Sequence, residues 1–133
     1  MELFPLRLRP GDDLRRALEA TALPPGATGA FVASGMGSLA GLKLRLAGAS
    51  LTTSFDGDFE LLTLAGSLTP GGSHLHISAA DAQGAVFGGH LLNGNIVRTT
   101  AEILLVVVFN QPLSRVFDPA TGYPELHVGD KQT

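Results

Sequence analysis

The 133-residue chain contains no cysteine. This absence excludes disulfides and thiolate metal ligands, and it removes any redox indication of the compartment. Charge is scarce as well: charged residues make up 16% and hydrophobic residues 44% of the sequence, whereas an average soluble domain has about 25% charged residues. Because so few charges cover a monomer's surface poorly, we expect part of the apolar surface to be buried between subunits.

Clustered basic residues are missing too. The chain has 9 lysines and arginines against 12 aspartates and glutamates, and its net charge is −3. The one tight basic group, Arg7, Arg9, Arg15 and Arg16, is diluted by two aspartates between its members. A protein that binds nucleic acid through the phosphates needs such residues clustered, so we do not expect direct binding to nucleic acid.

Long hydrophobic runs and targeting signals are also absent. The longest apolar run covers residues 103–109, far short of the ~20 residues that span a membrane. The N-terminus shows no basic segment followed by an apolar one, so no signal peptide is expected. These observations predict a cytoplasmic protein with no membrane partner. It is expected to form one domain over residues 1–133, with a frayed tail at 129–133.

Alternating apolar and polar residues dominate the chain. Residues 3–9 alternate as in a strand with one solvated face, and leucines and alanines at helical spacing over residues 14–22 predict one early helix. Further strands are predicted at 28–34, 38–46, 49–55, 58–68, 73–79, 84–88 and 99–109. Residues 81–84 are predicted to form a hairpin turn. The pattern indicates an α+β domain built mainly from antiparallel strands.

Residues 35–40, G-M-G-S-L-A, match a loose dinucleotide-binding pattern. That fingerprint needs a helix next, whereas residues 41–46 alternate like a strand. We therefore predict a tight glycine turn between two strands at this position.

The strongest chemical signal is a group of three histidines within 17 residues. His74 and His76 alternate along a strand and would project on the same face, and His90 returns after a short turn. Three imidazoles suit zinc, with nickel, cobalt or iron as other candidates, and would leave one coordination position open. Solvated imidazoles without a metal are the simpler alternative.

A catalytic metal site would also need a general acid or base near a metal-bound water. Glu60 and Glu102 are the candidates, because each lies within an otherwise apolar strand, where a carboxylate must be paired, hydrogen-bonded or at a pocket wall. Each could equally be an outward-facing residue on a half-exposed strand. Neither a P-loop nor a zinc-finger spacing is present.

Three segments together have a familiar pattern: G-D-F-E-L-L-T-L-A-G-S-L at 57–68, S-H-L-H-I-S-A-A-D-A-Q-G-A-V-F-G-G-H-L at 73–91 and V-R-T-T-A-E-I-L-L at 97–105. With P-G-D-D-L at 10–14, G-M-G-S-L at 35–39 and D-P-A-T-G-Y-P-E-L at 118–126, they resemble the plants and prokaryotes conserved (PPC) domain. This domain accompanies AT-hooks in plant nuclear proteins. The chain resembles a stand-alone prokaryotic member over nearly its whole length.

The resemblance implies an antiparallel sheet curled into a sandwich or small barrel, short flanking helices and assembly as a homotrimer. It also implies that His74, His76 and His90 are the recurrent histidines of the prokaryotic members, gathered in a cleft near a subunit boundary. In plant members the domain serves protein contacts while the AT-hook binds DNA, and no R-G-R-P-like hook occurs in this chain.

Two functions from different classes therefore stand against each other, and the sequence does not decide whether the protein is an enzyme. The first is a trimeric, zinc-binding assembly or regulatory module that contacts itself and a protein partner. The second is a small metal-dependent enzyme of the hydrolase or lyase type, with zinc on the three histidines and Glu60 or Glu102 nearby. Binding to DNA is the weakest alternative.

Overall fold

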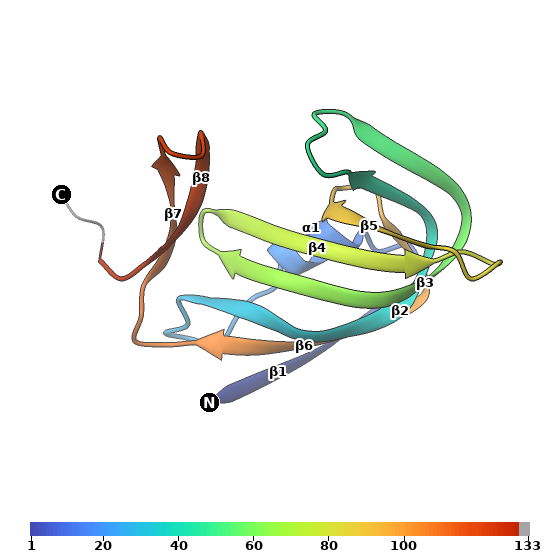
Figure 1. Ribbon diagram of the computed structural model, residues 1–133. Coiled ribbons are helices and arrows are strands. Elements are labelled where there is room, and N and C mark those ends of the chain that lie inside the picture. The colour runs from blue at the N-terminus through green and yellow to red at the C-terminus, as the bar shows by residue number, and fades with distance from the viewer. Residues whose placement is uncertain (131–133) are drawn as a thin grey trace.

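Strands make up most of the computed structural model, which describes residues 1–130 (Figure 1). In chain order the elements are β1 (Glu2–Leu8), α1 (Leu14–Glu19), β2 (Gly29–Arg45), β3 (Thr52–Thr69), β4 (Gly72–Ala80), β5 (Val86–Leu91), β6 (Ile96–Val108), β7 (Leu113–Asp118) and β8 (Tyr123–Val128). All strand pairs are antiparallel. The predicted mainly antiparallel sheet with one early helix is confirmed.

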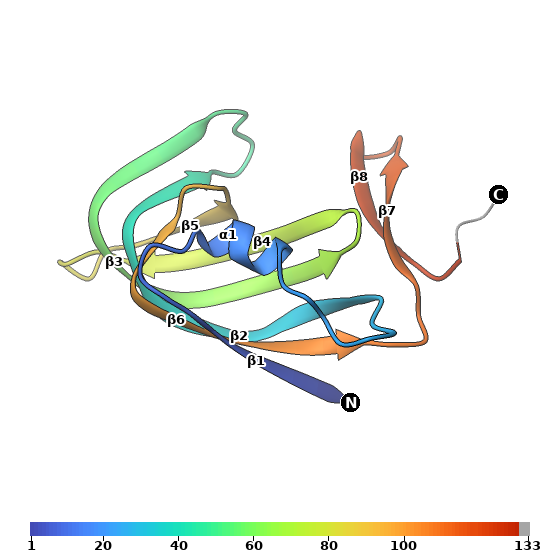
Figure 2. The same cartoon turned by 180° about the vertical axis from the view of Figure 1, so that it is seen from behind.

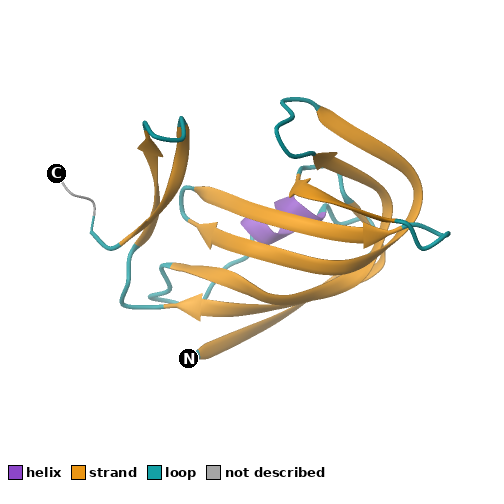
Figure 3. Cartoon of the chain, viewed as in Figure 1, coloured by secondary structure: helices purple, strands orange, loops and turns teal. Residues whose placement is uncertain are grey.

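The main sheet has the strand order β1-β6-β2-β3-β4-β5 and closes on itself where β5 also pairs with the end of β2. The closing pairs are Leu44 with Leu91 and Arg45 with His90. The result is a small barrel-like sheet, with β7 and β8 forming a separate hairpin beside it (Figures 1 and 3).

Mostly leucine side chains, with some isoleucine, valine, alanine and phenylalanine, form the core. The helix α1 lies over the concave side of the sheet (Figure 2). Leu14 and Leu18 of α1 are fully buried there. Asp13 caps the helix by accepting a hydrogen bond from the Arg16 amide. The buried Asn95 side chain bonds to both backbone groups of Lys43 and to the Leu92 carbonyl, so its polar atoms have partners.

The predicted glycine turn at 35–40 is wrong, because β2 runs through it without interruption. The strand instead changes its register with β6 twice, just before this region between Val32 and Ser34 and within it between Gly37 and Leu39. Gly37 has a φ of 153°, and a Cβ there would collide with the Thr100 carbonyl of β6. The glycine therefore permits a bend and a close backbone approach inside one long strand, rather than a turn. Likewise the strands predicted at 49–55 and 58–68 are the single strand β3.

Three further predictions need correction. The helix ends at Glu19 rather than at residue 22, and within residues 1–130 it is the one α-helix, so the predicted additional flanking helices are not found. The hairpin β7–β8 was not predicted. Of the predicted frayed tail, the Gly129 amide bonds to the Pro112 carbonyl, and residues 131–133 lie outside the described residues. Across the described part of the chain, no helix has the length and apolar character needed to cross a membrane.

Candidate metal centre

Strand β4 places His74 and His76 on one face of the sheet. They alternate with Leu75 and Ile77, which are buried in the core, so both imidazoles project to the outer side. His90 joins them from β5, where it pairs directly with His76. The predicted strand at 84–88 stopped before His90, but β5 continues to Leu91, and this longer strand brings the third imidazole into register.

The three imidazoles are close enough to share one ion. Their candidate ligand nitrogens all lie within 4.8 Å of one another. His76 Nε2 and His90 Nδ1 are 3.1 Å apart. Zinc–nitrogen bonds of about 2.0–2.1 Å in a tetrahedral site place ligand nitrogens about 3.4 Å apart. Small side-chain rotations would therefore bring all three nitrogens to one centre, and the donor set suits zinc.

Burial and nearby positive charge lower the pKa of two of these imidazoles, those of His74 and His90, which favours their neutral form. Burial, with the nearby Arg45 guanidinium as the next cause, lowers the pKa of His90 to about 4. Burial and then His76 lower the pKa of His74 below its usual value. A metal binds the neutral imidazole, so both side chains are in the ligand form at neutral pH without first losing a proton.

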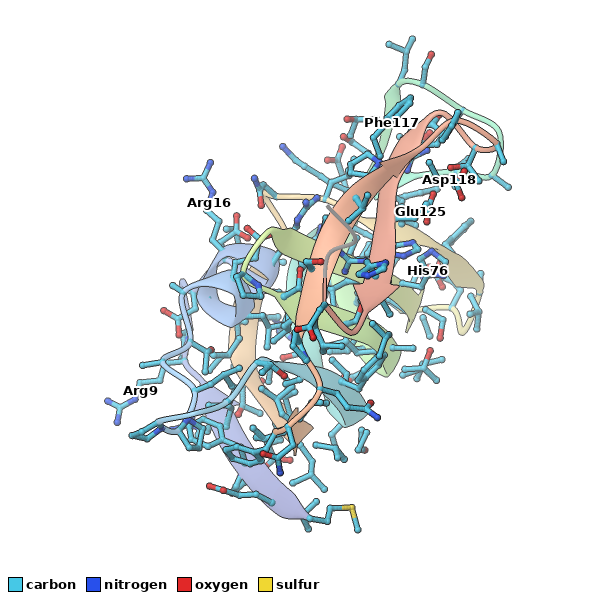
Figure 4. All side chains as sticks on the ribbon, turned by 90° about the vertical axis from the view of Figure 1, so that its left-hand side faces the viewer. Arg9, Arg16, His76, Phe117, Asp118 and Glu125 are labelled. Atoms are coloured by element: carbon cyan, nitrogen blue, oxygen red, sulfur yellow. The ribbon has the colours of Figure 1, made fainter. Side chains whose placement is uncertain are left out.

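A cavity of about 320 Å³ opens beside His74 and His90. Its wall comes from five parts of the fold: α1, the end of β2, the β3–β4 turn with the start of β4, the end of β5, and the β7–β8 hairpin. The other lining residues are Arg15, Arg45, Gly71, Gly72, Ser73, Arg115, Tyr123, Pro124 and Glu125. Figure 4, seen from the hairpin side, labels Glu125 on the hairpin and His76 on the sheet.

Hydrogen bonds tie two of these walls to the sheet. Arg115 of β7 donates to the Ser67 hydroxyl at 2.9 Å, and Ser67 is itself buried on β3. Ser73, next to His74, donates to Glu19 of α1. Burial raises the pKa of Glu19, but the hydrogen bonds from Ser73 and Arg15 outweigh it and hold the pKa below its usual value. Glu19 is therefore an ionised acceptor that fixes the position of Ser73.

The structure does not bring either predicted glutamate to the histidines. Glu60 of β3 pairs with Ala80, four residues along β4 from His76, or about 13 Å at strand spacing. Glu102 lies on β6, opposite Arg7 and Met36. Both are exposed, and neither lines the cavity beside the histidines.

The carboxylate of this cavity is Glu125, which sequence reasoning missed together with Arg45 and Arg115. Glu125 lies in the segment 118–126 that carried part of the family resemblance, but nothing in its spacing connects it to histidines far earlier in the chain. Arg45 could be inferred only from the pairing of β2 with β5.

A larger cavity of about 650 Å³ lies between α1, the loop that follows it and the β3–β4 turn. It shares Gly71, Gly72 and Ser73 with the cavity beside the histidines. The Ser73–Glu19 hydrogen bond lies where the two cavities meet.

The chain matches one family model and two curated proteins. The model of a family described as the Plants and Prokaryotes Conserved (PCC) domain matches residues 1–109. Two curated proteins called bifunctional protein GlmU, from the Synechococcus strains JA-3-3Ab and JA-2-3B'a(2-13), are 46% and 45% identical to the chain over 128 residues. The alignments cover 96% of this chain but 21% and 20% of those proteins, so the chain spans about a fifth of their length.

Solved structures show the same fold. A hypothetical protein from Salmonella enterica is 36% identical, with a TM-score of 0.91 over 98% of this chain and 95% of that chain. A protein from Archaeoglobus fulgidus, described as metal-containing, is 25% identical, with a TM-score of 0.76 over 94% of this chain and 92% of that chain. Both cover the β7–β8 region at least in part, whereas the family match ends before it.

Proposed function

Because this chain belongs to the Plants and Prokaryotes Conserved (PCC) domain family, we propose that it is a metal-binding assembly module whose three-histidine centre takes zinc. The observation that carries the proposal is the convergence of His74, His76 and His90 on one face, with their nitrogens within 4.8 Å. The description of the Archaeoglobus relative as metal-containing supports it. Bound zinc would be a Lewis acid with one coordination position left for a ligand.

Assembly of the chain with copies of itself, as a homotrimer, is the second part of the proposal. The outer side of β1, β6 and β2 carries apolar side chains that are at least partly exposed. Register places Leu3 opposite Val106 and Val106 opposite Phe31, so they form one patch, with Leu104 and Met36 beside them. Leu3 is 53% and Met36 57% exposed. We call these five residues the outer apolar face. A second copy of the chain would remove it from water.

The relatives support the role of a module. A segment nearly as long as this chain, and 46% identical to it, occurs within a protein about five times longer that is described as bifunctional. The activity in the name of those proteins belongs to the whole protein, and the recurrence of this unit within them supports a binding or assembly role for it. A protein partner of this chain is expected on the same grounds.

A metal-dependent enzyme of the hydrolase or lyase type is the second candidate function. The cavity beside the histidines favours it, because a ligand could lie next to the metal there. Glu125 would supply the carboxylate that acid–base chemistry needs, in place of Glu60 or Glu102.

Metal analysis of the purified protein tests the proposal. Untagged protein prepared without chelator should contain about one zinc per chain, because three neutral imidazoles converge on one point. His76→Ala and His90→Ala should each lose most of that zinc, since two nitrogens bind zinc far more weakly than three. Elemental analysis after gel filtration measures the content.

His127→Ala is the matched control. His127 is the fourth histidine, lies on β8 outside the cluster and should not affect zinc content. A wild-type protein without metal, or His76→Ala protein with full zinc, would contradict the proposed site. Zinc together with turnover of a hydrolytic substrate, lost in Glu125→Gln, would favour the enzyme over the module.

A further inference from the structure

The cavity beside the three histidines is lined by more positive than negative side chains, although the chain as a whole is acidic. The chain as a whole has a net charge of −3, yet three arginines and one glutamate line this cavity: Arg15, Arg45, Arg115 and Glu125. A cavity lined mainly by guanidinium groups in an acidic protein favours an anionic ligand.

Two of these guanidinium groups lack a carboxylate partner. Arg15 is paired with Glu19 at 2.9 Å. Within residues 1–130, by contrast, Arg45 and Arg115 make no ion pair at 4.0 Å or less. Arg45 has only the Ala49 carbonyl at 3.5 Å, and Arg115 has the Ser67 hydroxyl at 2.9 Å. Both side chains are half-buried, so water replaces the missing partner only in part.

Arg45 is the arginine most closely associated with the histidines. It pairs with His90 in the β2–β5 ladder. It also lines both the 320 Å³ cavity with His74 and a second cavity of about 220 Å³ with His76. Arg45 is therefore a shared wall residue of the two cavities that contain the histidines.

A divalent ion at the cluster would make this imbalance larger. Three neutral imidazoles bring no charge, so the full charge of the ion would remain beside Arg45 and Arg115, with Glu125 as the one carboxylate in the cavity wall. An anion in the cavity would offset these charges. Guanidinium groups present paired N–H donors that match the oxygens of carboxylate and phosphate groups.

We propose that this cavity is an oxyanion subsite of the metal centre, which binds the carboxylate or phosphate group of a small ligand beside the three histidines. Arg45 and Arg115 are the binding residues, and the Glu125 carboxylate in the wall would repel negative charge placed next to it. The proposal deepens the metal function proposed above and rests on it. Arg115 and Glu125 come from the hairpin, which lies beyond residues 1–109 matched by the family model, so the subsite depends on a segment outside that match.

Calorimetric titration of zinc-loaded protein with inorganic phosphate and, separately, with acetate tests the subsite. At least one of the two oxyanions should bind with a dissociation constant below about 10 mM, and chloride at the same ionic strength should not compete. The two titrations distinguish a phosphate ligand from a carboxylate ligand. Arg45→Gln should weaken binding about tenfold or more, because a charged hydrogen-bond donor is lost. Arg115→Lys keeps the charge but loses the paired donors, and should weaken binding less.

Arg98→Gln is the matched control, because Arg98 is an exposed arginine paired with Asp58 away from the cavity. Zinc content is measured on every sample, and near-wild-type zinc in Arg45→Gln shows that its fold and metal site are intact. If zinc is bound but neither oxyanion binds, or if Arg45→Gln binds as well as wild type, the subsite is refuted and the metal site stands. If the wild-type protein binds no zinc, the metal function fails and the subsite fails with it as part of a metal centre.

Discussion

At the scale of single residues, Gly66 of β3 lies next to the backbone of the two β4 histidines. Gly66 lies between Ala65, which pairs with His76, and Ser67, which pairs with His74. Its φ is 146°, and a Cβ there would collide with the backbone carbonyl of His74. The backbone that carries the proposed metal ligands therefore approaches β3 at a point where only glycine fits.

Gly66→Ala should destabilise the protein by about 2 kcal/mol or more, because left-handed strain of about 1–3 kcal/mol adds to the collision. It should also lower zinc content, since His74 must move. Urea denaturation measures the first effect and elemental analysis the second. Gly48→Ala separates the two causes: Gly48 has a φ of 70°, but a Cβ added there would meet no atom within 4 Å, so it should show only the smaller strain cost and full zinc content. Equal losses in both variants would refute the steric argument.

At the scale of elements, the β7–β8 hairpin is held to the sheet through a small number of contacts. Arg115 donates to the Ser67 hydroxyl and reaches the Ser67 carbonyl at 3.5 Å. Figure 1 shows the hairpin standing apart from the main sheet at this point. The position of the hairpin, and with it one wall of the cavity beside the histidines, therefore depends on few interactions.

Ser67→Ala should loosen the hairpin without unfolding the sheet. Amides of residues 113–128 should exchange with solvent roughly tenfold faster, because a hydrogen bond to a charged donor contributes about 1.5–3 kcal/mol. Hydrogen-exchange mass spectrometry measures this, with amides of β2 and β3 as internal reference. Ser114→Ala is the control, since the buried Ser114 hydroxyl has no hydrogen-bond partner among the described residues. Unchanged exchange in Ser67→Ala would show that other contacts hold the hairpin.

The elements also show what the sequence could and could not predict. Period-two alternation predicted that His74 and His76 share a face, and the turn at 81–84 predicted the return of β5, so the histidine cluster was within reach. The continuity of β2 could not be predicted, because the glycines at 35, 37 and 41 have the same sequence pattern in a turn and in a bend within a strand. The difference is decided by a distant backbone, that of Thr100 for Gly37. Glu125 and Arg45 reach the cavity only through pairings that join distant parts of the chain.

At the scale of the whole molecule, the outer apolar face connects the low charge content with the proposed assembly. Leu3, Phe31 and Met36 are each at least 40% exposed on it. The sequence predicted burial of apolar surface between subunits, and we propose this face as the surface that a second copy covers.

Leu3→Lys should convert a trimer of about three times 13.8 kDa to monomers, because a lysine ammonium cannot be buried in an apolar interface without a partner. Light scattering coupled to gel filtration measures the mass. Leu51→Lys is the matched control: Leu51 is 78% exposed but lies in the loop between β2 and β3, away from this face. It should stay trimeric. A monomeric wild-type protein would refute the trimer, and a trimeric Leu3→Lys would place the interface elsewhere.

The pairing of β1 with β6 has a consequence for folding during synthesis on the ribosome. Among the described residues, β1 joins the sheet through β6 alone, with Glu2 opposite Val107 and Leu8 opposite Ala101. At about 5–20 residues per second, β1 waits about 5–20 s until its partner strand β6 has been synthesised. During that interval Leu3, Phe4, Leu6 and Leu8 form an unpaired apolar strand. Proline at position 5 and arginine at position 7 then protect it, because both disfavour pairing with a neighbouring nascent chain.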